Sequence, residues 1–76
     1  MLTEENKSEV TKRLAHRIHM LRVERRWSQE ALARITGLHR NYVGSVERAE
    51  VNMGLENIEK IAKAFEISTS ELMQGI

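Results

Sequence analysis

Apolar side chains recur at helical spacing over residues 8–25. The steps of four, four and three residues gather them on one side of an α-helix, and the positions are Val10, Leu14, Ile18 and Leu21. Ser8 stands before this run, where a serine oxygen caps the unpaired amides of a first helical turn. The pattern predicts a first helix over residues 8–25 with one buried side.

A second, two-turn helix is predicted from Ser28 to Gly37. Ser28 is its expected N-cap, and Trp27 and Leu32 have the spacing of a hydrophobic staple around that cap. Leu32 and Ala33 then face inward. Gly37 ends the helix, because glycine adopts the left-handed backbone conformation at low cost.

A third helix is expected over residues 40–48, after a connection made by Leu38 and His39. Val43 and Val46 form its inner side, and His39 stands where a side chain can cap the helix. Two short helices joined by three or four residues that include a glycine have the spacing of a helix-turn-helix. Residues 28–48 are therefore the predicted helix-turn-helix.

Two further helices complete the prediction. Ser68 and Glu71 have the spacing of a capping box at the start of the last helix. The helix before it is expected over residues 55–65, with an apolar side made by Leu55, Ile58, Ile61, Ala62 and Phe65. The fold class is thus all-α, with five short helices in one compact domain and a flexible segment over residues 1–8.

Composition sets outer limits on this reading. A chain of 76 residues is one small domain that buries roughly 60% of its unfolded surface. It has no cysteine, so disulfides and thiolate metal sites are excluded. Its apolar runs are too short to span a membrane, and its acidic first residues do not resemble a secretory signal. A cytosolic location is expected.

Charge is divided unevenly along the chain. Residues 10–48 hold nine lysine or arginine side chains against three glutamates, a net charge of +6 within a total of only +1. Residues 1–9 carry one lysine against three glutamates, and residues 49–76 carry two against five. Eight of the nine central cations are arginine, whose planar fork suits phosphate oxygens and guanine edges.

The helix over residues 40–48 is expected to present a polar outer side. Arginine pairs with guanine O6 and N7, and asparagine pairs with adenine N6 and N7. Two explanations of the glycine on this side stay open: close approach of a sugar-phosphate wall or thymine methyl, or tight packing of a neighbouring helix. The outer side consists of Arg40, Asn41, Gly44, Ser45 and Arg48.

Residues 14–72 resemble the Cro/repressor-type (XRE-like) helix-turn-helix family, and residues 38–48 are most similar to the controller proteins of restriction–modification systems. The matching segments, in order, are Arg17-Ile18, Leu21-Arg22, Ser28-Gln29-Glu30-Ala31-Leu32-Ala33, Gly37-Leu38, Val46-Glu47-Arg48, Ile61-Ala62-Lys63-Ala64-Phe65 and Ser70-Glu71-Leu72. The resemblance implies a phage-repressor-like domain that regulates transcription by reading double-stranded DNA.

The resemblance also implies a role for particular residues. Arg22 and Glu47 match an ion pair that joins the first helix to the third. The implied base readers are Arg40, Asn41 and Ser45, with Arg48 near the backbone or an outer base. The phosphate-binding candidates are Gln29, Tyr42, Asn52 and His39, the last of which is expected primarily as a cap of its helix.

Several positions depart from the family pattern. Arg26 and Ala49 stand where the family usually has glycine, and Met53-Gly54 stand where a proline is common. Val51 replaces an arginine that commonly precedes Asn52 in controller-like members. Val51 and Ala49 keep open a second function class, in which the same fold is a protein-interaction module such as an antitoxin or adaptor.

Apolar residues near the C-terminus exceed what two short helices bury between themselves. They either close the core under the first helix or form the two-fold interface of a homodimer, which the resemblance implies. A dimer would place two recognition helices about 34 Å apart, matching successive major grooves of a palindromic operator. The candidates are Phe65, Ile67, Leu72, Met73 and Ile76.

Other chemistry receives little support. His16 and His19 are three residues apart on the first helix, but no third ligand accompanies them, so we interpret both as solvated. No set of nucleophile, base and orienting residue is visible, and an enzyme is not expected. A basic first helix is also typical of membrane-surface or calmodulin-type ligands, but the core needs its apolar side. No cofactor, metal, membrane or small-molecule ligand is expected.

Overall fold

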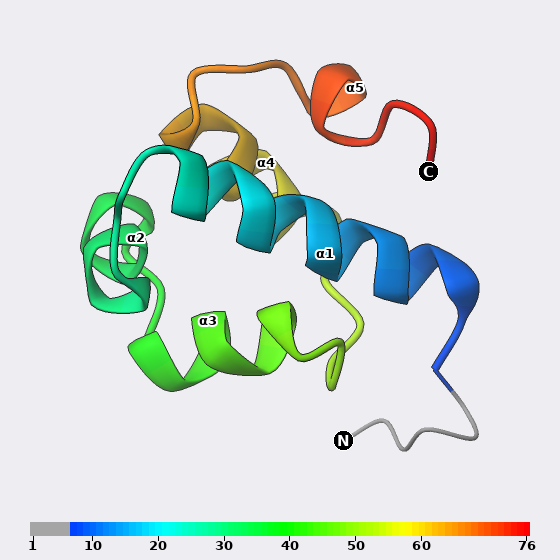
Figure 1. Cartoon of the computed structure of the whole chain (residues 1–76), viewed down its shortest axis with the longest axis horizontal. Helices are drawn as coiled ribbons and strands as arrows, with labels where there is room; N and C mark the ends of the chain where they lie inside the picture. Colours follow the sequence, from blue (N-terminus) through cyan, green and yellow to red (C-terminus); the bar gives the residue numbers. More distant parts are fainter. Residues whose placement is uncertain (1–6) are drawn as a thin grey trace.

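Five α-helices account for most of residues 7–76, the part of the chain that the computed structural model describes (Figure 1). They are α1 (Glu9–Glu24), α2 (Gln29–Thr36), α3 (Arg40–Glu47), α4 (Leu55–Ala64) and α5 (Thr69–Leu72). The all-α prediction is confirmed, with α3 and α4 ending one residue earlier than expected. Residues 1–6 of the predicted flexible segment lie outside the described residues. No helix within residues 7–76 is long and apolar enough to cross a membrane.

Serine caps start three of these helices, as predicted. The side chain of Ser8 accepts a hydrogen bond from the amide of Thr11, and Ser28 accepts one from Ala31. Ser68 and the side chain of Glu71 form the expected capping box. Each bond satisfies an amide that has no carbonyl partner within its helix.

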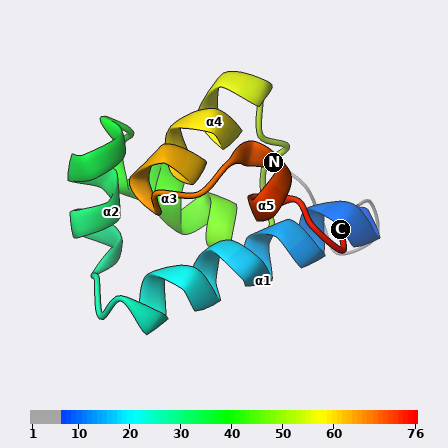
Figure 2. The ribbon, with the colours of Figure 1, turned by 90° about the horizontal axis from the view of Figure 1, so that it is seen from above.

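The helices enclose one core. In the views of Figures 1 and 2, α2 lies across one end of the domain, where it contacts α3 and α4, and α1 runs beside α3 and α5. Every helix contributes to the buried cluster, so no helix can be removed without exposing apolar surface. The cluster consists of Leu14, Ile18, Leu32, Ala33, Val43, Val46, Ile58, Ile61, Ala62, Phe65 and Leu72.

Two predicted core positions are wrong. Leu55 is 82% exposed and Val10 is 48% exposed. Both residues lie in the first turn of their helix, and the buried side of each helix begins one turn later, at Ile58 and Leu14. The spacing identified the correct side of the helix but not where that side meets the core.

Three helices end in the left-handed conformation without glycine. Arg26, Ala49 and Glu66 have φ angles of 58°, 58° and 59°. At each end two amides bond back to carbonyls of the last turn, the pairing of a Schellman motif. The family glycines that are replaced by Arg26 and Ala49 therefore stand at positions where the backbone favours glycine.

An aromatic pair closes the end of the domain near α2. The rings of Trp27 and Phe65 stack with centroids 5.7 Å apart and planes 11° from parallel. The guanidinium of Arg25 lies 4.9 Å from the Phe65 ring centroid and donates to the Phe65 carbonyl at 2.9 Å. Arg25, which the sequence did not single out, thus joins the end of α1 to the end of α4.

Replacing Arg26 by glycine is expected to raise the free energy of unfolding by about 0.5–1 kcal/mol. A non-glycine residue in the left-handed region costs about 1–2 kcal/mol, and the greater freedom of glycine in the unfolded chain offsets part of the gain. Urea denaturation of Arg26→Gly tests this, with Arg26→Ala as the control that keeps the strain. Equal stability of the two variants would contradict it.

Candidate nucleic-acid interface

The connection between α2 and α3 is fixed at both ends. Gly37 adopts the left-handed conformation with φ 76°, and its amide donates to the Ala33 carbonyl at 2.8 Å. His39 is the N-cap of α3, and its Nδ1 accepts a hydrogen bond from the amide of Asn41 at 3.0 Å. The cap expected of His39 is confirmed, and the start of α3 is held by its own side chain.

The outer side of α3 carries exposed polar groups. The side chain of Arg40 is 65% exposed and Asn41 is exposed, whereas Ser45 is half-buried. One guanidinium nitrogen of Arg40 lies 3.3 Å from a carboxylate oxygen of Glu30 on α2. Arg48, just after the helix, is 57% exposed and bonds Glu50 at 3.0 Å. Exposed pairs of this kind are weak and exchange readily for other partners.

Gly44 does not belong to this exposed surface, which corrects the prediction. It is buried, because the side chains of Arg48 and Gln29 lie over it. A Cβ atom at this position would stand 2.9 Å from Arg48 Nη1 and 3.4 Å from Gln29 Oε1. Within the protein, the space beside Gly44 is filled by one side chain from the end of α3 and one from α2, and close approach of DNA to this position stays a prediction.

Glu47 receives hydrogen bonds from two neighbouring helices. Its carboxylate takes both bonds of the Arg22 fork, with Nε at 2.7 Å and Nη2 at 3.0 Å. Gln29 Nε2 donates to it at 3.3 Å and His19 Nδ1 lies 2.8 Å away. The side chain is 3% exposed, and Arg22 is 13% exposed. The ion pair expected between Arg22 and Glu47 is present, and it is part of a larger cluster.

His19 corrects the interpretation of the two helix histidines as solvated. His16 is exposed, but His19 contacts Glu47. Burial alone would raise the pKa of Glu47, but hydrogen bonds from Arg22, His19 and Gln29 outweigh it and hold the pKa below its ordinary value. Glu47 is therefore a charged carboxylate that orients Gln29 at the N-terminus of α2.

Two further phosphate candidates are also held within the protein. Tyr42 is half-buried, and its hydroxyl accepts a hydrogen bond from Asn57 of α4 at 3.1 Å. Asn52 is exposed, and its Oδ1 accepts from the Thr11 hydroxyl at 3.3 Å. Both bonds leave the donor groups of Tyr42 and Asn52 available to another partner.

Two of the five dimer candidates are wrong. Phe65 is 2% exposed and Leu72 is 0% exposed in the single chain, so neither is accessible to a second copy. Phe65 is covered by the Trp27 ring, and Leu72 completes the core. The remaining candidates are half-buried at the edge of that core: Ile67, Met73 and Ile76.

The arrangement defines the protein class. Two short helices meet at a three-residue connection that begins with a left-handed glycine, and the second helix exposes its polar side. This is a helix-turn-helix, whose second helix is called the recognition helix. Residues 18–72 match the protein family described as Helix-turn-helix (HTH_3). The chain belongs to this helix-turn-helix family.

Relatives of established fold support this membership. A hypothetical transcription factor of Neisseria meningitidis serogroup B is 47% identical over 60 residues, which cover 79% of this chain and 57% of that protein. The restriction–modification controller protein C.AhdI from Aeromonas hydrophila has a crystal structure that matches with a TM-score of 0.79 and 44% identity. That match covers 82% of this chain and 94% of C.AhdI.

A third similar structure contains nucleic acid. The controller protein C.Esp1396I was solved as a tetramer in complex with its natural 35-base-pair operator. It matches this chain with a TM-score of 0.79 and 29% identity, covering 87% of this chain and 91% of C.Esp1396I. The resemblance to restriction–modification controller proteins is confirmed by these relatives.

Glu47→Gln is expected to lower the free energy of unfolding by about 3 kcal/mol at neutral pH, because it leaves the Arg22 charge without its carboxylate. Since the pKa of Glu47 is depressed in the folded state, its contribution is present above the ordinary value of 4.5 and is lost as pH falls through the folded value. Denaturation at several pH values should show that the difference in the free energy of unfolding between Glu47→Gln and the unmodified protein becomes smaller in acid. A difference in the free energy of unfolding that does not change with pH, or that equals the difference for the exposed control Glu24→Gln, would refute the assignment of Glu47 as the charged partner of Arg22.

Gly44→Ala is expected to raise the free energy of unfolding by up to about 1 kcal/mol, because alanine favours the helix. The new methyl group mainly displaces the end of the flexible Arg48 side chain, which can move away. Thermal denaturation measures the effect, with Ser45→Ala as the neighbouring control. A clear loss of stability in Gly44→Ala alone would show that the side chains of Arg48 and Gln29 cannot move away from the new methyl group.

Proposed function

We propose that the chain is a sequence-specific transcriptional regulator that binds double-stranded DNA. The observation that carries this proposal is the outer side of α3, where Arg40 and Asn41 are exposed on a helix whose two ends are fixed. The side chains lie on a helix that is narrow enough to enter the major groove. This function requires no catalytic group and no cofactor.

The proposed base readers follow from their donor groups. Arg40 donates in a fork to guanine O6 and N7, and Asn41 pairs with adenine N6 and N7. Ser45 supplies a short hydroxyl between Arg40 and Asn41 on one side and Arg48 on the other. Arg48 reaches the DNA backbone or an outer base. The ion pair between Arg40 and Glu30 opens at little cost when a guanine edge replaces the carboxylate.

The proposed phosphate contacts are groups that keep a donor after their internal bonds are made. Gln29 uses one amide hydrogen for Glu47 and stands at the N-terminus of α2, where unpaired amides favour anions. His39 accepts at Nδ1, which leaves its Nε2 as the ring nitrogen that can donate to another partner. Tyr42 and Asn52 likewise accept within the protein and retain O–H and N–H donors.

The active species is proposed to be a homodimer on a palindromic operator. The domain measures 31 × 25 × 22 Å, so two domains side by side place their recognition helices at a separation comparable to the about 34 Å of one DNA turn. The half-buried apolar residues at the C-terminal end supply the proposed interface: Ile67, Met73 and Ile76. The similarity to C.AhdI and C.Esp1396I supports control of restriction–modification genes.

Arg40→Ala is expected to remove discrimination at one base pair of the operator, at a cost of about 1–3 kcal/mol, because a bidentate guanine contact is lost. Gln29→Ala is expected to weaken the operator and random DNA alike. Selection from a random duplex pool identifies the operator, and fluorescence anisotropy then measures both variants on both duplexes. Equal losses for Arg40→Ala on operator and random DNA would reject its role as a reader. Absence of binding by the unmodified protein at low salt would favour a protein-interaction module instead.

A further inference from the structure

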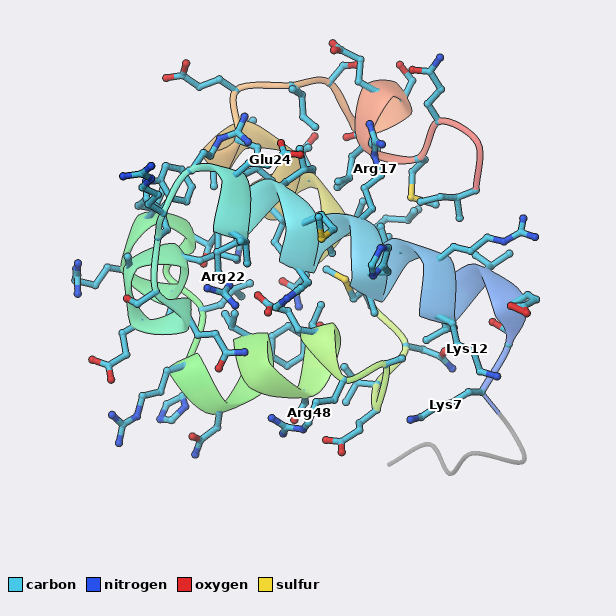
Figure 3. All side chains as sticks on the ribbon, in the orientation of Figure 1. Lys7, Lys12, Arg17, Arg22, Glu24 and Arg48 are labelled. Carbon is cyan, nitrogen blue, oxygen red and sulfur yellow. The ribbon has the colours of Figure 1, made fainter. Side chains whose placement is uncertain are left out.

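A groove of about 520 Å³ runs between α1 and the C-terminal half of α3. Figure 3 shows Lys7 and Lys12 extending below the first half of α1, on the same side of that helix as Arg48. The groove begins at Gln29 and continues along α1 toward its N-terminus. Its polar lining comes from Lys7, Lys12, His16, His19, Gln29 and Arg48.

The lining is cationic. Glu47 is the one carboxylate among the described residues that line the groove, and it is 3% exposed beneath Arg22, His19 and Gln29. Its charge is already matched, so it opposes an incoming anion only weakly. Lys12 and His16, by contrast, are exposed on α1. The lysine and arginine charges, with Lys12 exposed on α1, therefore determine which ligand the groove attracts.

Contacts across the groove hold its two walls together. The ammonium of Lys7 donates to the Arg48 carbonyl at 3.1 Å, which places a cation at the C-terminal end of α3. The Thr11 hydroxyl donates to Asn52 in the segment that follows α3 at 3.3 Å. The first turn of α1 and Lys7 just before it are thereby tied to the C-terminal end of the recognition helix and the segment that follows it.

The length of the groove suits a nucleic-acid strand. Lys12, His16 and His19 extend over about 10 Å of helix axis at 1.5 Å per residue. That length exceeds the about 3.4 Å by which a DNA strand advances along the duplex axis per phosphate, so the groove can accommodate more than one phosphate. The groove is continuous with the phosphate contact already proposed for Gln29, and this continuity favours a nucleic-acid strand over an acidic peptide.

We propose that this groove holds the phosphodiester backbone of one DNA strand beside the major groove that α3 enters. This inference rests on the proposed function and extends the contact surface from the helix-turn-helix to the first half of α1. Lys12 and His16 supply the contacts with phosphate oxygens. Lys7 lies at the far end of the groove, and the Arg48 guanidinium lies near Gln29 at its beginning. These contacts raise affinity for any duplex and do not select sequence.

Lys12→Gln and Arg13→Gln form a matched pair for the first test. Both residues are exposed on α1 and each substitution removes one charge, but only Lys12 lines the groove. Lys12→Gln is expected to weaken the operator and a random duplex alike, by about three- to tenfold at low salt. The loss of affinity of Lys12→Gln relative to the unmodified protein should become about threefold smaller between 50 and 200 mM salt. The reason is that one fewer phosphate contact lowers the slope of log affinity against log salt concentration by about 0.9. Arg13→Gln should bind like the unmodified protein.

Neutral methylphosphonate linkages, placed singly along the selected operator, locate the contact. At the phosphate that lies in the groove, a neutral linkage should lower the affinity of the unmodified protein and of Arg13→Gln for the operator. It should leave the affinity of Lys12→Gln unchanged. If Lys12→Gln matches Arg13→Gln in affinity and salt slope, the groove is not a phosphate site and the proposed function still stands. If the unmodified protein binds no duplex, both proposals are overturned. Thermal unfolding of each variant confirms that folding is unchanged.

Discussion

The last residue of α3 is a glutamate whose carboxylate is almost wholly removed from water. An unpaired charge at such a place costs several kcal/mol, so the fold has to supply partners. Arg22 and His19 approach from α1, and Gln29 approaches from α2. The requirement to satisfy Glu47 therefore fixes the recognition helix relative to both of its neighbours. It also sets the orientation of the Gln29 amide at the start of α2.

Other contacts restrain α3 along the rest of its length. His39 holds its first turn and Tyr42 bonds to Asn57 of α4. At the far end Ala49 adopts the left-handed conformation, and the Glu50 amide bonds back to Ser45. The residue here is alanine, whose Cβ atom makes the left-handed conformation costly. The polar side chains on the outer face are thus presented by a backbone that is held from its cap to its C-terminal end.

Local pattern predicted the features that depend on neighbours in the chain. The helices and their serine caps, the left-handed Gly37 and the cap formed by His39 all follow from residues at fixed short separations. The ion pair between Arg22 and Glu47 came instead from family resemblance. The burial of Gly44 was missed because it depends on how long side chains from α2 and from the end of α3 fold over it.

The errors at the C-terminal end have the same origin. From the sequence, Phe65 and Leu72 exceed the apolar residues that two short helices can bury between themselves. In the tertiary fold Trp27 covers Phe65 and α1 packs beside α5, which carries Leu72. The partner of His19 was also hidden, since spacing on one helix cannot show a carboxylate supplied by another. The groove beside α3 was missed because its walls are far apart in sequence.

The anchoring of α3 at both ends has a consequence for the duplex. A recognition helix that is held at both ends leaves more of the adjustment on binding to the nucleic acid. The base steps of DNA differ in how easily they bend, twist and change groove width. DNA sites with flexible steps at untouched positions would then be favoured over stiff sites that offer identical base edges. On the proposed function, the mechanical compliance of the DNA thereby becomes part of what this small domain recognises.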